Sequence, residues 1–220
     1  MALTLYSMKK KLEHVLSFSG GKDSTAMLLK MVELNMPIDE IRYCDCGDWE
    51  FPEMISHILK IESMFKDKFK RVYFNPSIDV LLERYKMPTG GYRWCTAYKT
   101  NALHRGLRKD DSLIYLGFAS DESKRFKGRT IKGYKAKAPL IEWGMTEKDC
   151  LSYCYDKGYY FGGLYDCFDR VSCWTCPFKN KKELKMLKEY YPKLWDKRKR
   201  LYEKFTYEYA NNYEEIISWV

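Results

Sequence analysis

Short apolar segments alternate with amphipathic ones through the first half of the chain. Four segments have the length and composition of buried strands: residues 14–19, 41–45, 71–74 and 112–118. Three segments between them repeat apolar residues at helical spacing: residues 23–34, 52–65 and 96–105. This alternation predicts an α/β fold, a doubly wound parallel sheet with helices on both faces. Ligands of such sheets bind beyond the carboxyl ends of the strands, so the loops there are the expected site.

The regular alternation loosens after residue 118. Residues 124–137 are basic and contain glycine, and we expect them to run over the surface near the site. Thr146 and Asp149 have the spacing of a capping box, which predicts a helix that ends near residue 157. The following stretch, to residue 178, is rich in Gly, Tyr and Cys and has no clear periodicity. It closes a predicted nucleotide-binding domain of residues 1–178.

The C-terminal segment is basic and has a helical pattern. Residues 179–220 are predicted to form a helical extension on the sheet domain, with a break near Pro192. Ten Lys and Arg residues and only three acidic residues lie between positions 179 and 200. A solvated helix face explains this pattern most simply. The residues expected to pack inward are Leu184, Leu187, Leu194 and Trp195. A docking surface for nucleic acid or an acidic protein is the alternative.

A glycine-rich loop joins the first predicted strand to the first helix. Its sequence is Ser19-Gly20-Gly21-Lys22-Asp23-Ser24-Thr25. The first turn of a helix offers backbone N–H groups and a favourable dipole to phosphates, and the two glycines let phosphates approach closely. The three hydroxyls can add donors, Lys22 can add charge, and Asp23 can cap the helix or hold Mg²⁺. A bare Gly-Gly pair would fit a simple turn as well, but the full string indicates nucleotide binding. The string lacks the Gly-Lys-Ser/Thr ending of a Walker A loop.

The string Ser-Gly-Gly-Lys-Asp-Ser resembles the signature of the PP-loop ATP pyrophosphatases, which are adenine nucleotide alpha hydrolases. Four further segments follow the order found in the phosphoadenosine phosphosulfate (PAPS) reductase-like branch of that superfamily. They are Asp45-Cys46-Gly47 with Phe51-Pro52-Glu53, Arg93-Trp94-Cys95 with Lys99, Gly117 with Asp121-Glu122-Ser123 and Arg125, and Pro139-Leu140-Ile141-Glu142-Trp143. The chain is thus similar to this branch from about residue 14 to 178, which implies the PP-loop fold.

The resemblance implies a site for ATP and Mg²⁺. The implied nucleotide-binding residues are those of the loop, residues 19–25, together with Asp45, Gly47, Gly117, Asp121 and Glu122. The implied catalytic residues are Lys22, Asp23, Arg93, Lys99 and Arg125. Isolated basic residues are usually solvated surface charges, yet within this string the last three are expected to contact phosphates.

A CxxC motif, Cys173-Trp174-Thr175-Cys176, lies in the irregular stretch. Two thiolates at this spacing can ligate one metal centre, and a tetrahedral or cubane site needs about four ligands. Cys95 is the distant candidate, and Cys167 is the expected fourth ligand because the spacing Cys-x5-Cys-x2-Cys keeps it near the motif. Iron–sulfur members of the resembled branch pair a cysteine before the Lys99 position with a downstream CxxC, which implies a [4Fe-4S] cluster here.

The metal and its fourth ligand stay open at this point. The resembled reductases use a Cys-Cys pair where this chain has a Trp-Cys pair ending at Cys95. Four cysteines also bind zinc, and a redox-active CxxC or inert core thiols are further alternatives. Cys44 and Cys46 are interpreted as strand-end residues near the nucleotide. Cys150 and Cys154, four residues apart on one helix face, are expected to be buried thiols.

Composition and charge narrow the class of protein. The 220 residues are 45% hydrophobic and 31% charged, an ordinary balance for one globular domain with a small appendage. The sequence shows no apolar run of membrane-spanning length and no signal peptide core in residues 1–13, so a cytoplasmic location is expected. In that reducing compartment the eight cysteines favour metal or redox chemistry over disulfides. A net charge of +9 favours a polyanionic partner, whether a nucleotide or a nucleic acid.

Three functions are compatible with these features. The leading hypothesis is an enzyme that uses ATP and Mg²⁺ to adenylate an acceptor and release pyrophosphate for sulfur transfer. Its expected partners are a nucleic acid or a sulfur-donor protein, with no membrane, and a homo-oligomer is compatible with the sequence. The second is reduction of a sulfonucleotide, PAPS or adenosine phosphosulfate (APS), to sulfite. We expect this to be inefficient, because the resembled reductases carry a nucleophilic cysteine in a C-terminal tail and no cysteine follows Cys176. The third is a nucleic-acid-binding module without turnover.

Overall fold

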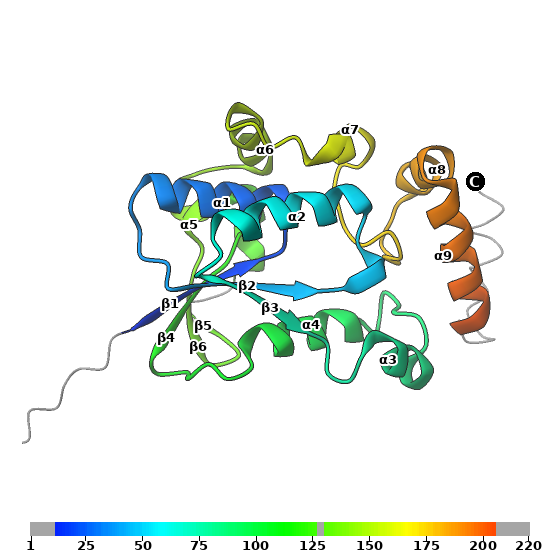
Figure 1. Ribbon diagram of the computed structural model, residues 1–220, viewed down its shortest axis with the longest axis horizontal. Helices are drawn as coiled ribbons and strands as arrows, with labels where there is room; N and C mark the ends of the chain where they lie inside the picture. Colours follow the sequence, from blue (N-terminus) through cyan, green and yellow to red (C-terminus); the bar gives the residue numbers. More distant parts are fainter. Residues whose placement is uncertain (1–11, 127–129, 206–220) are drawn as a thin grey trace, which may run out of the picture.

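The computed structural model describes residues 12–126 and 130–205 and contains a six-stranded sheet (Figure 1). The strands are β1 (Glu13–Phe18), β2 (Glu40–Asp45), β3 (Phe69–Tyr73), β4 (Ser112–Tyr115), β5 (Thr130–Ile131) and β6 (Tyr134–Lys137). Their order in the sheet is β3-β2-β1-β4-β6-β5. The neighbouring strands are parallel except β5 and β6, which pair antiparallel. The predicted doubly wound α/β fold is confirmed.

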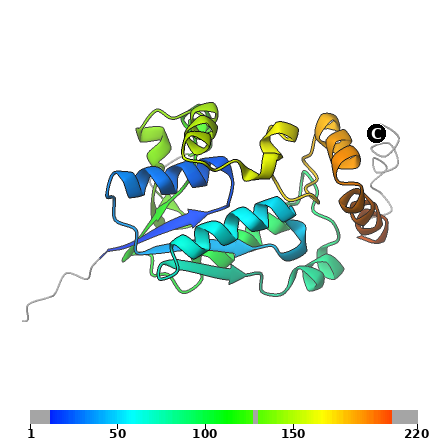
Figure 2. The same ribbon diagram turned by 45° about the horizontal axis from the view of Figure 1, so that its top comes forward.

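Helices cover both faces of the sheet. They are α1 (Lys22–Glu33), α2 (Pro52–Met64), α3 (Ile78–Tyr85), α4 (Trp94–His104), α5 (Pro139–Glu142), α6 (Glu147–Asp156), α7 (Leu164–Cys167), α8 (Lys181–Tyr190) and α9 (Pro192–Phe205). In Figure 1, α1 and α2 lie on one face and α3 and α4 on the other. Figure 2 shows α6, α7 and α8 following one another on the side of α1. Within the described ranges, no helix has the length and apolar content needed to cross a membrane.

Two local sequence signals are confirmed. Thr146 and Asp149 form the predicted capping box, in which each side chain accepts the other residue's backbone N–H at the start of α6. The predicted break near Pro192 separates α8 from α9. Both signals depend only on backbone chemistry within a few residues, which is why they could be recognised without knowledge of the fold.

The segment 124–137 was predicted as a surface loop, and this prediction is wrong in part. Residues Tyr134–Lys137 form β6, which pairs with β4 inside the sheet. Tyr134 and Ala136 are buried, whereas Lys135 and Lys137 are exposed. The strand has only four residues. Its alternating lysines made the segment look uniformly basic and hid the period of two. Residues 127–129 of this segment lie outside the described residues.

The C-terminal helices are held by core contacts. Leu184 and Leu187 of α8 and Trp195 of α9 are buried in the same apolar cluster as residues of β1. Tyr202 and Phe205, farther along α9, enter a second cluster with residues of α3 and α4. Burying a large apolar side chain contributes about 1.5–3 kcal/mol. The predicted inward positions Leu184, Leu187 and Trp195 are confirmed, and Leu194 is partly buried against the same cluster as predicted.

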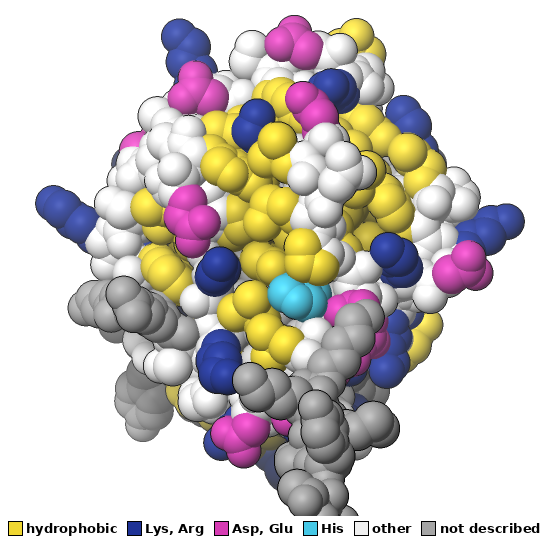
Figure 3. All heavy atoms as spheres, turned by 90° about the vertical axis from the view of Figure 1, so that its left-hand side faces the viewer, with side chains coloured by type: hydrophobic (Ala, Val, Ile, Leu, Met, Phe, Trp, Pro, Cys, Tyr) yellow, Lys and Arg dark blue, Asp and Glu magenta, His cyan; other side chains and the backbone are white. Residues whose placement is uncertain are grey.

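The carboxyl ends of β1 and β4 define the end of the sheet where a ligand is expected. β1 leads through α1 to β2, whereas β4 leads to β6 on its other side, so the loops after these neighbouring strands diverge. Doubly wound sheets bind ligands at such a point. At the opposite end, apolar side chains gather on the surface (Figure 3), and Val32, Met36, Ile38 and Phe65 line a hollow there. Polar chemistry is therefore concentrated at the carboxyl end.

Candidate functional site

A cavity of about 430 Å³ opens at the carboxyl ends of the strands. Its volume lies in the range of ligand pockets. The predicted site residues that line it are Ser19, Gly21, Lys22, Asp23, Ser24, Arg93, Cys95, Lys99, Gly117, Glu122, Arg125, Cys173 and Cys176. The nucleotide loop and the cysteine motif are far apart in sequence, yet they face the same space.

The loop after β1 presents the amino end of α1 to the cavity. The Ser19 N–H donates to Ser24 Oγ at 3.2 Å, and the Ser24 hydroxyl donates to the Gly21 carbonyl at 3.1 Å. Gly21 is the N-cap residue of α1 and has no side chain with which to cap it. The helix dipole and the first-turn N–H groups therefore favour an anion here, such as a phosphate.

Two loop residues that were predicted to bind the nucleotide face the interior. Gly20 has a φ of +83°, and a Cβ there would lie 2.9 Å from the Met54 sulfur, so a glycine is required. Thr25 is fully buried, and its Oγ1 lies 3.1 Å from His57 Nε2. Neither residue is among the described residues that line the cavity. Both instead hold the loop against α2.

Lys22 and Asp23 meet Glu147, the first residue of α6, at the cavity wall. Lys22 Nζ lies 2.5 Å from Glu147 Oε2 and 3.6 Å from Asp23 Oδ2. Burial raises the pKa of Asp23 to about 6, against the opposing effect of the Lys22 charge. Asp23 Oδ1 is buried and has no hydrogen-bond partner among the described residues. An unpartnered carboxylate oxygen at this position can ligate a hard cation such as Mg²⁺.

Tyr165 of α7 packs against the same loop. Its phenol oxygen accepts a 2.7 Å hydrogen bond from the Lys22 N–H, and Lys22 Nζ lies 5.5 Å from its ring centroid. The sequence reasoning missed both Tyr165 and Glu147. Tyr165 lies in the stretch without periodicity, so the sequence carried no signal for it. Glu147 directly follows the capping residue Thr146, which placed it at a helix start but not at the nucleotide loop.

The loop after β4 packs directly on the start of α1. A Cβ at Gly117 would lie 3.0 Å from the backbone nitrogen of Ser24, so this contact also requires glycine. Glu122 and Arg125 line the cavity and form an ion pair with each other. Asp121 is outside the described lining, and its carboxylate accepts the N–H of the first residue of α6 at 3.2 Å. Asp121 thus supports the cavity wall.

The predicted nucleoside-binding residues after β2 have other partners. Asp45 Oδ1 accepts the Gly47 N–H at 2.7 Å, and Asp45 Oδ2 lies 2.6 Å from Arg71 Nη1. Arg71 also pairs with Glu62 of α2. In the described part of the chain, Asp45 and Gly47 do not line the cavity. They shape the turn after β2, from which Cys46 does reach it.

Two predicted cations approach the cavity from α4. Arg93, at the N-cap, lies 5.2 Å from the ring centroid of Phe178, and Lys99 Nζ lies 3.8 Å from Glu50 Oε1. Burial raises the pKa of Glu50 to about 7. Burial alone would lower the pKa of Lys99, but the surrounding thiolate and carboxylate charges outweigh it and raise that pKa. Lys99 is therefore a cation at the wall of the cavity.

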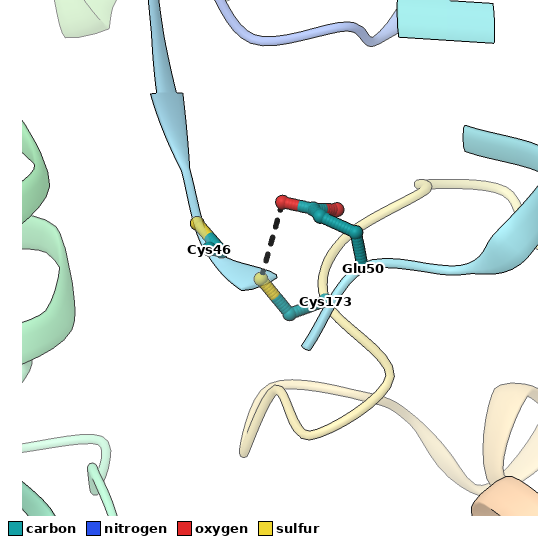
Figure 4. A group of neighbouring side chains, drawn as sticks. All are labelled: Cys46, Glu50 and Cys173. Atoms are coloured by element: carbon teal, nitrogen blue, oxygen red, sulfur yellow. Dashed lines mark hydrogen bonds between the residues drawn. The ribbon is translucent and has the colours of Figure 1, made fainter. Parts of the chain in front are cut away.

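The thiols that line the cavity are Cys46, Cys95, Cys173 and Cys176. The ligand atoms of Cys46, Glu50 and Cys173 all lie within 4.8 Å of one another (Figure 4). The Cys173 thiol donates a hydrogen bond to Glu50 Oε1 at 3.8 Å. The predicted ligand Cys167 is outside the described lining and packs against the main apolar core. Cys150 and Cys154 are fully buried, as predicted.

Hydrogen bonds from two sides hold the CxxC segment. On one side the Trp174 N–H donates to the Trp49 carbonyl at 3.1 Å. From α9, Arg198 donates to the Trp174 carbonyl at 3.0 Å, and the Tyr202 hydroxyl donates to the Thr175 carbonyl at 3.2 Å. Arg198 is only 5% exposed. This member of the predicted basic surface is therefore a structural contact.

The donor groups around the cavity fit the metal and nucleotide that the resemblance implies. Four thiols from separate segments can ligate the four irons of a [4Fe-4S] cluster, and thiols also suit zinc. The open amino end of α1 suits phosphates, and the unpartnered Asp23 Oδ1 suits Mg²⁺. The two sets of donors face one cavity, so chemistry that joins a nucleotide to a metal centre is geometrically reasonable.

Two relatives come from Methanocaldococcus jannaschii. The uncharacterized proteins MJ0066 and MJ0973 are 28% and 29% identical to this chain over alignments that cover 94% and 92% of it. The chain spans 44% and 51% of the length of these two relatives.

A solved structure and a family profile also match. The U34-tRNA thiolase NcsA from Methanococcus maripaludis, with its [4Fe-4S] cluster, aligns over 89% of this chain and 72% of its own, with a TM-score of 0.50 and 16% identity. At that identity the likeness shows a shared fold. The profile of the phosphoadenosine phosphosulfate reductase domain matches residues 13–179, which include the nucleotide loop, the loops after the strands and the CxxC motif. The chain therefore belongs to the phosphoadenosine phosphosulfate reductase domain family.

Proposed function

We propose that this protein is a PP-loop enzyme that binds ATP with Mg²⁺, adenylates an acceptor and thereby activates it for sulfur transfer. One observation carries the proposal: the amino end of α1 and a set of four thiols line the same cavity. A phosphate-binding loop alone would fit many nucleotide enzymes. Thiols that face the same cavity favour chemistry in which an activated acceptor meets a metal–sulfur centre.

The adenylation step follows from the charges at the loop. An acceptor oxygen forms a bond to the α-phosphorus of ATP, the bond from that phosphorus to the α–β bridging oxygen breaks, and pyrophosphate leaves with the electron pair. The acceptor hydroxyl gives up its proton to solvent. The first-turn N–H groups of α1 and the Lys22 ammonium stabilise the charge on the leaving group, and Asp23 holds the metal that neutralises the phosphates.

Lys22 must exchange partners during this reaction. Its ammonium pairs with Glu147 and Asp23. Phosphate oxygens would compete for the same ammonium, and the two carboxylates would then be free to face the metal. Arg93 and Arg125 also line the cavity and can contact the remaining phosphates or the acceptor.

The metal centre is proposed to be a [4Fe-4S] cluster that includes Cys95, Cys173 and Cys176 among its ligands, with zinc as the alternative. A bound cluster supplies redox-active and Lewis-acidic iron. The hydrogen bonds to the carbonyls of Trp174 and Thr175 fix the direction of the CxxC thiols toward the cavity. Lys99 places a positive charge beside the thiolates.

The acceptor is proposed to be a nucleic acid, and sulfur would come from a donor protein. The net charge of +9 supports a polyanionic acceptor. The cavity is also lined by exposed Phe178, whose ring lies beside Arg93 and is a group on which a base can stack. The structural neighbour whose fold this chain shares is a thiolase of U34 in tRNA.

The second candidate is sulfonucleotide reduction, which membership of the family favours. The two functions are separated by supplying ATP, Mg²⁺ and total RNA in one reaction, and PAPS or APS with thioredoxin in another. We expect pyrophosphate in the first reaction, strongly reduced by Asp23→Asn, and little sulfite in the second. Robust sulfite formation that a single cysteine substitution abolishes, without pyrophosphate release from ATP, would establish the reductase instead.

A further inference from the structure

We infer that Cys46 is the fourth cysteine ligand of the metal centre and that Cys167 is not a ligand. This inference rests on the cluster part of the proposed function and concerns which residues of this chain hold it. Cys46 immediately follows β2, where the sequence had suggested only a strand-end residue. The structure brings it to the CxxC motif from a different part of the chain.

The first argument is the position of the thiols. Cys46 Sγ, Cys173 Sγ and a carboxylate oxygen of Glu50 lie within 4.8 Å of one another. Figure 4 shows Cys46 at the end of its strand and Cys173 on the loop that passes beside it. Cys95 and Cys176 line the same cavity. Two thiols thus come from the CxxC, one from the start of α4 and one from the turn after β2.

The second argument is that this juxtaposition is built into the fold. The Trp174 N–H donates to the Trp49 carbonyl at 3.1 Å, and its indole N–H donates to the Asp48 carbonyl at 2.5 Å. Both acceptors belong to the turn that carries Cys46, and Trp174 directly follows Cys173. These two bonds therefore fix the distance between the two cysteines, and the buried Trp174 side chain anchors the contact.

The third argument is that Cys167 is held elsewhere. It ends α7 and packs against the main apolar core, whereas Cys46, Cys95 and Cys173 share the second cluster with Trp94. The charges that act on the Cys167 thiol come from Asp166, Glu189 and Glu53. Tyr165 and Arg170, on either side of it in the sequence, line the cavity, whereas Cys167 does not.

The fourth argument is chemical. Cys46 is buried and Cys173 is half-buried, and both thiols lie beside the buried carboxylate of Glu50, with Lys99 as a neighbouring cation. Sulfur and carboxylate ligand atoms gathered at one point can share a bound metal, so this placement suits a metal centre. Four cysteine ligands saturate the four irons of a cubane.

The experiment uses the full-length protein, prepared anaerobically and reconstituted with iron and sulfide. The variants are Cys46→Ser, Cys167→Ser and, as a control, Cys44→Ser, which changes a buried cysteine two residues earlier that does not line the cavity. Iron, sulfide and zinc are measured per chain, together with the visible and Mössbauer spectra and the rate of iron transfer to a chelator. Circular dichroism and ATP affinity report whether each variant is folded.

We expect wild type, Cys44→Ser and Cys167→Ser to hold about four irons and four sulfides per chain, with the same spectra. Cys46→Ser should lose about one iron per cluster or release iron at least about ten times faster, because one iron lacks its thiolate. The inference is overturned if Cys46→Ser behaves like wild type, or if Cys167→Ser loses iron. If the wild-type protein binds one zinc per chain without sulfide, or binds no metal, the cluster is no longer part of the proposed function. ATP binding is tested separately, by the affinity measurement.

A measurement without substitutions covers the case in which Cys46→Ser does not fold. The wild-type apoprotein is treated with diamide, a two-electron oxidant that takes two protons and two electrons from a pair of neighbouring thiols, and the products are mapped by peptide mass spectrometry. We expect a disulfide between Cys46 and Cys173. A disulfide that joins Cys167 to the CxxC, without the Cys46 product, would overturn the inference.

Discussion

The backbone N–H of Lys22 donates a 2.7 Å hydrogen bond to the phenol oxygen of Tyr165. This amide belongs to the first turn of α1, which is where a phosphate would find its donors. A Cβ built at Gly21 would lie 3.3 Å from the same phenol oxygen, so Tyr165 also covers the preceding residue. Tyr165 therefore occupies part of the space and one of the donors that the loop offers to a phosphate.

Replacing Tyr165 by Phe should tighten ATP binding. The variant keeps the ring, which contacts Phe161 at 5.0 Å between centroids, but removes the oxygen that competes for the Lys22 N–H. A neutral hydrogen bond contributes about 0.5–1.5 kcal/mol, so the affinity should rise roughly 2- to 10-fold. Calorimetric titration with Mg-ATP measures it. Weaker binding would show that the hydroxyl contacts the nucleotide and does not compete with it.

Asp23→Asn should weaken the binding of ATP mainly when Mg²⁺ is present. The unpartnered Oδ1 is the atom available to the metal, and an amide is a poorer ligand for a hard cation than a carboxylate. We expect an affinity loss of about 10-fold or more in Mg²⁺, which is roughly 1.4 kcal/mol, and a much smaller change in EDTA. Asp110→Asn, at an exposed position before β4, is the matched control. Equal losses with and without Mg²⁺ would exclude Asp23 from the metal site.

The contribution of His57 to the stability of the protein should be lost as the pH falls from about 6.5 to 4. Burial lowers the pKa of His57 to about 4, so in this window the unfolded chain binds a proton that the folded chain does not. The loss due to His57 is at most about 3 kcal/mol. His104 is shifted in the same direction by burial, to a pKa of about 4. In urea unfolding, the unfolding free energy of wild type minus that of His57→Gln should therefore fall as the pH falls through this window, and parallel curves would contradict the assignment.

Most of the fold followed from local patterns. The strands that precede the main loops are short and carry buried apolar residues, and α2 begins at Pro52, where proline suits the first turn. β6 was missed because two of its four side chains are exposed lysines. The helix α3 was missed as well, because it is only eight residues long and lies between two loops. β6 forms where it does because it pairs with another strand within the sheet, and the local sequence pattern does not encode this pairing.

The site could be predicted where one contiguous string carries the chemistry, as in the loop at residues 19–25. It could not be predicted where separate segments meet. Cys46 reaches Cys173 only because two hydrogen bonds of Trp174 join the turn after β2 to the CxxC segment. Cys167 is closer to the CxxC motif in sequence, but it packs against the main apolar core. Tyr165 contacts the nucleotide loop only because α7 packs there. Spacing along the chain predicts metal ligands well only when no helix or strand lies between the residues concerned.

Arg198→Met should loosen the metal centre without affecting the nucleotide loop. Arg198 is buried and holds the Trp174 carbonyl, so its loss leaves that carbonyl without its donor. We expect a loss of unfolding free energy of about 2–3 kcal/mol and faster transfer of iron to a chelator, with unchanged ATP affinity. Arg200→Met, two residues away on the exposed side of α9, is the control. Unchanged iron retention in Arg198→Met would remove α9 from the support of the CxxC segment.

The exposed cations of the C-terminal helices should contribute salt-sensitive affinity for RNA. Arg198 does not belong to this set because it is buried, whereas Lys193 and Arg200 are exposed. Lys193→Glu combined with Arg200→Glu should weaken RNA binding about 10-fold at low salt and reduce the dependence of log K on log salt, because phosphate contacts and their released counterions are lost. Lys66→Glu combined with Lys68→Glu changes the net charge by the same amount just before β3, at the opposite end of the sheet, and should have a smaller effect. Fluorescence anisotropy with a labelled RNA at low and moderate salt measures the RNA affinity of both double variants. If the two double variants lose affinity equally, binding depends on overall charge, and α8 and α9 do not form a docking surface.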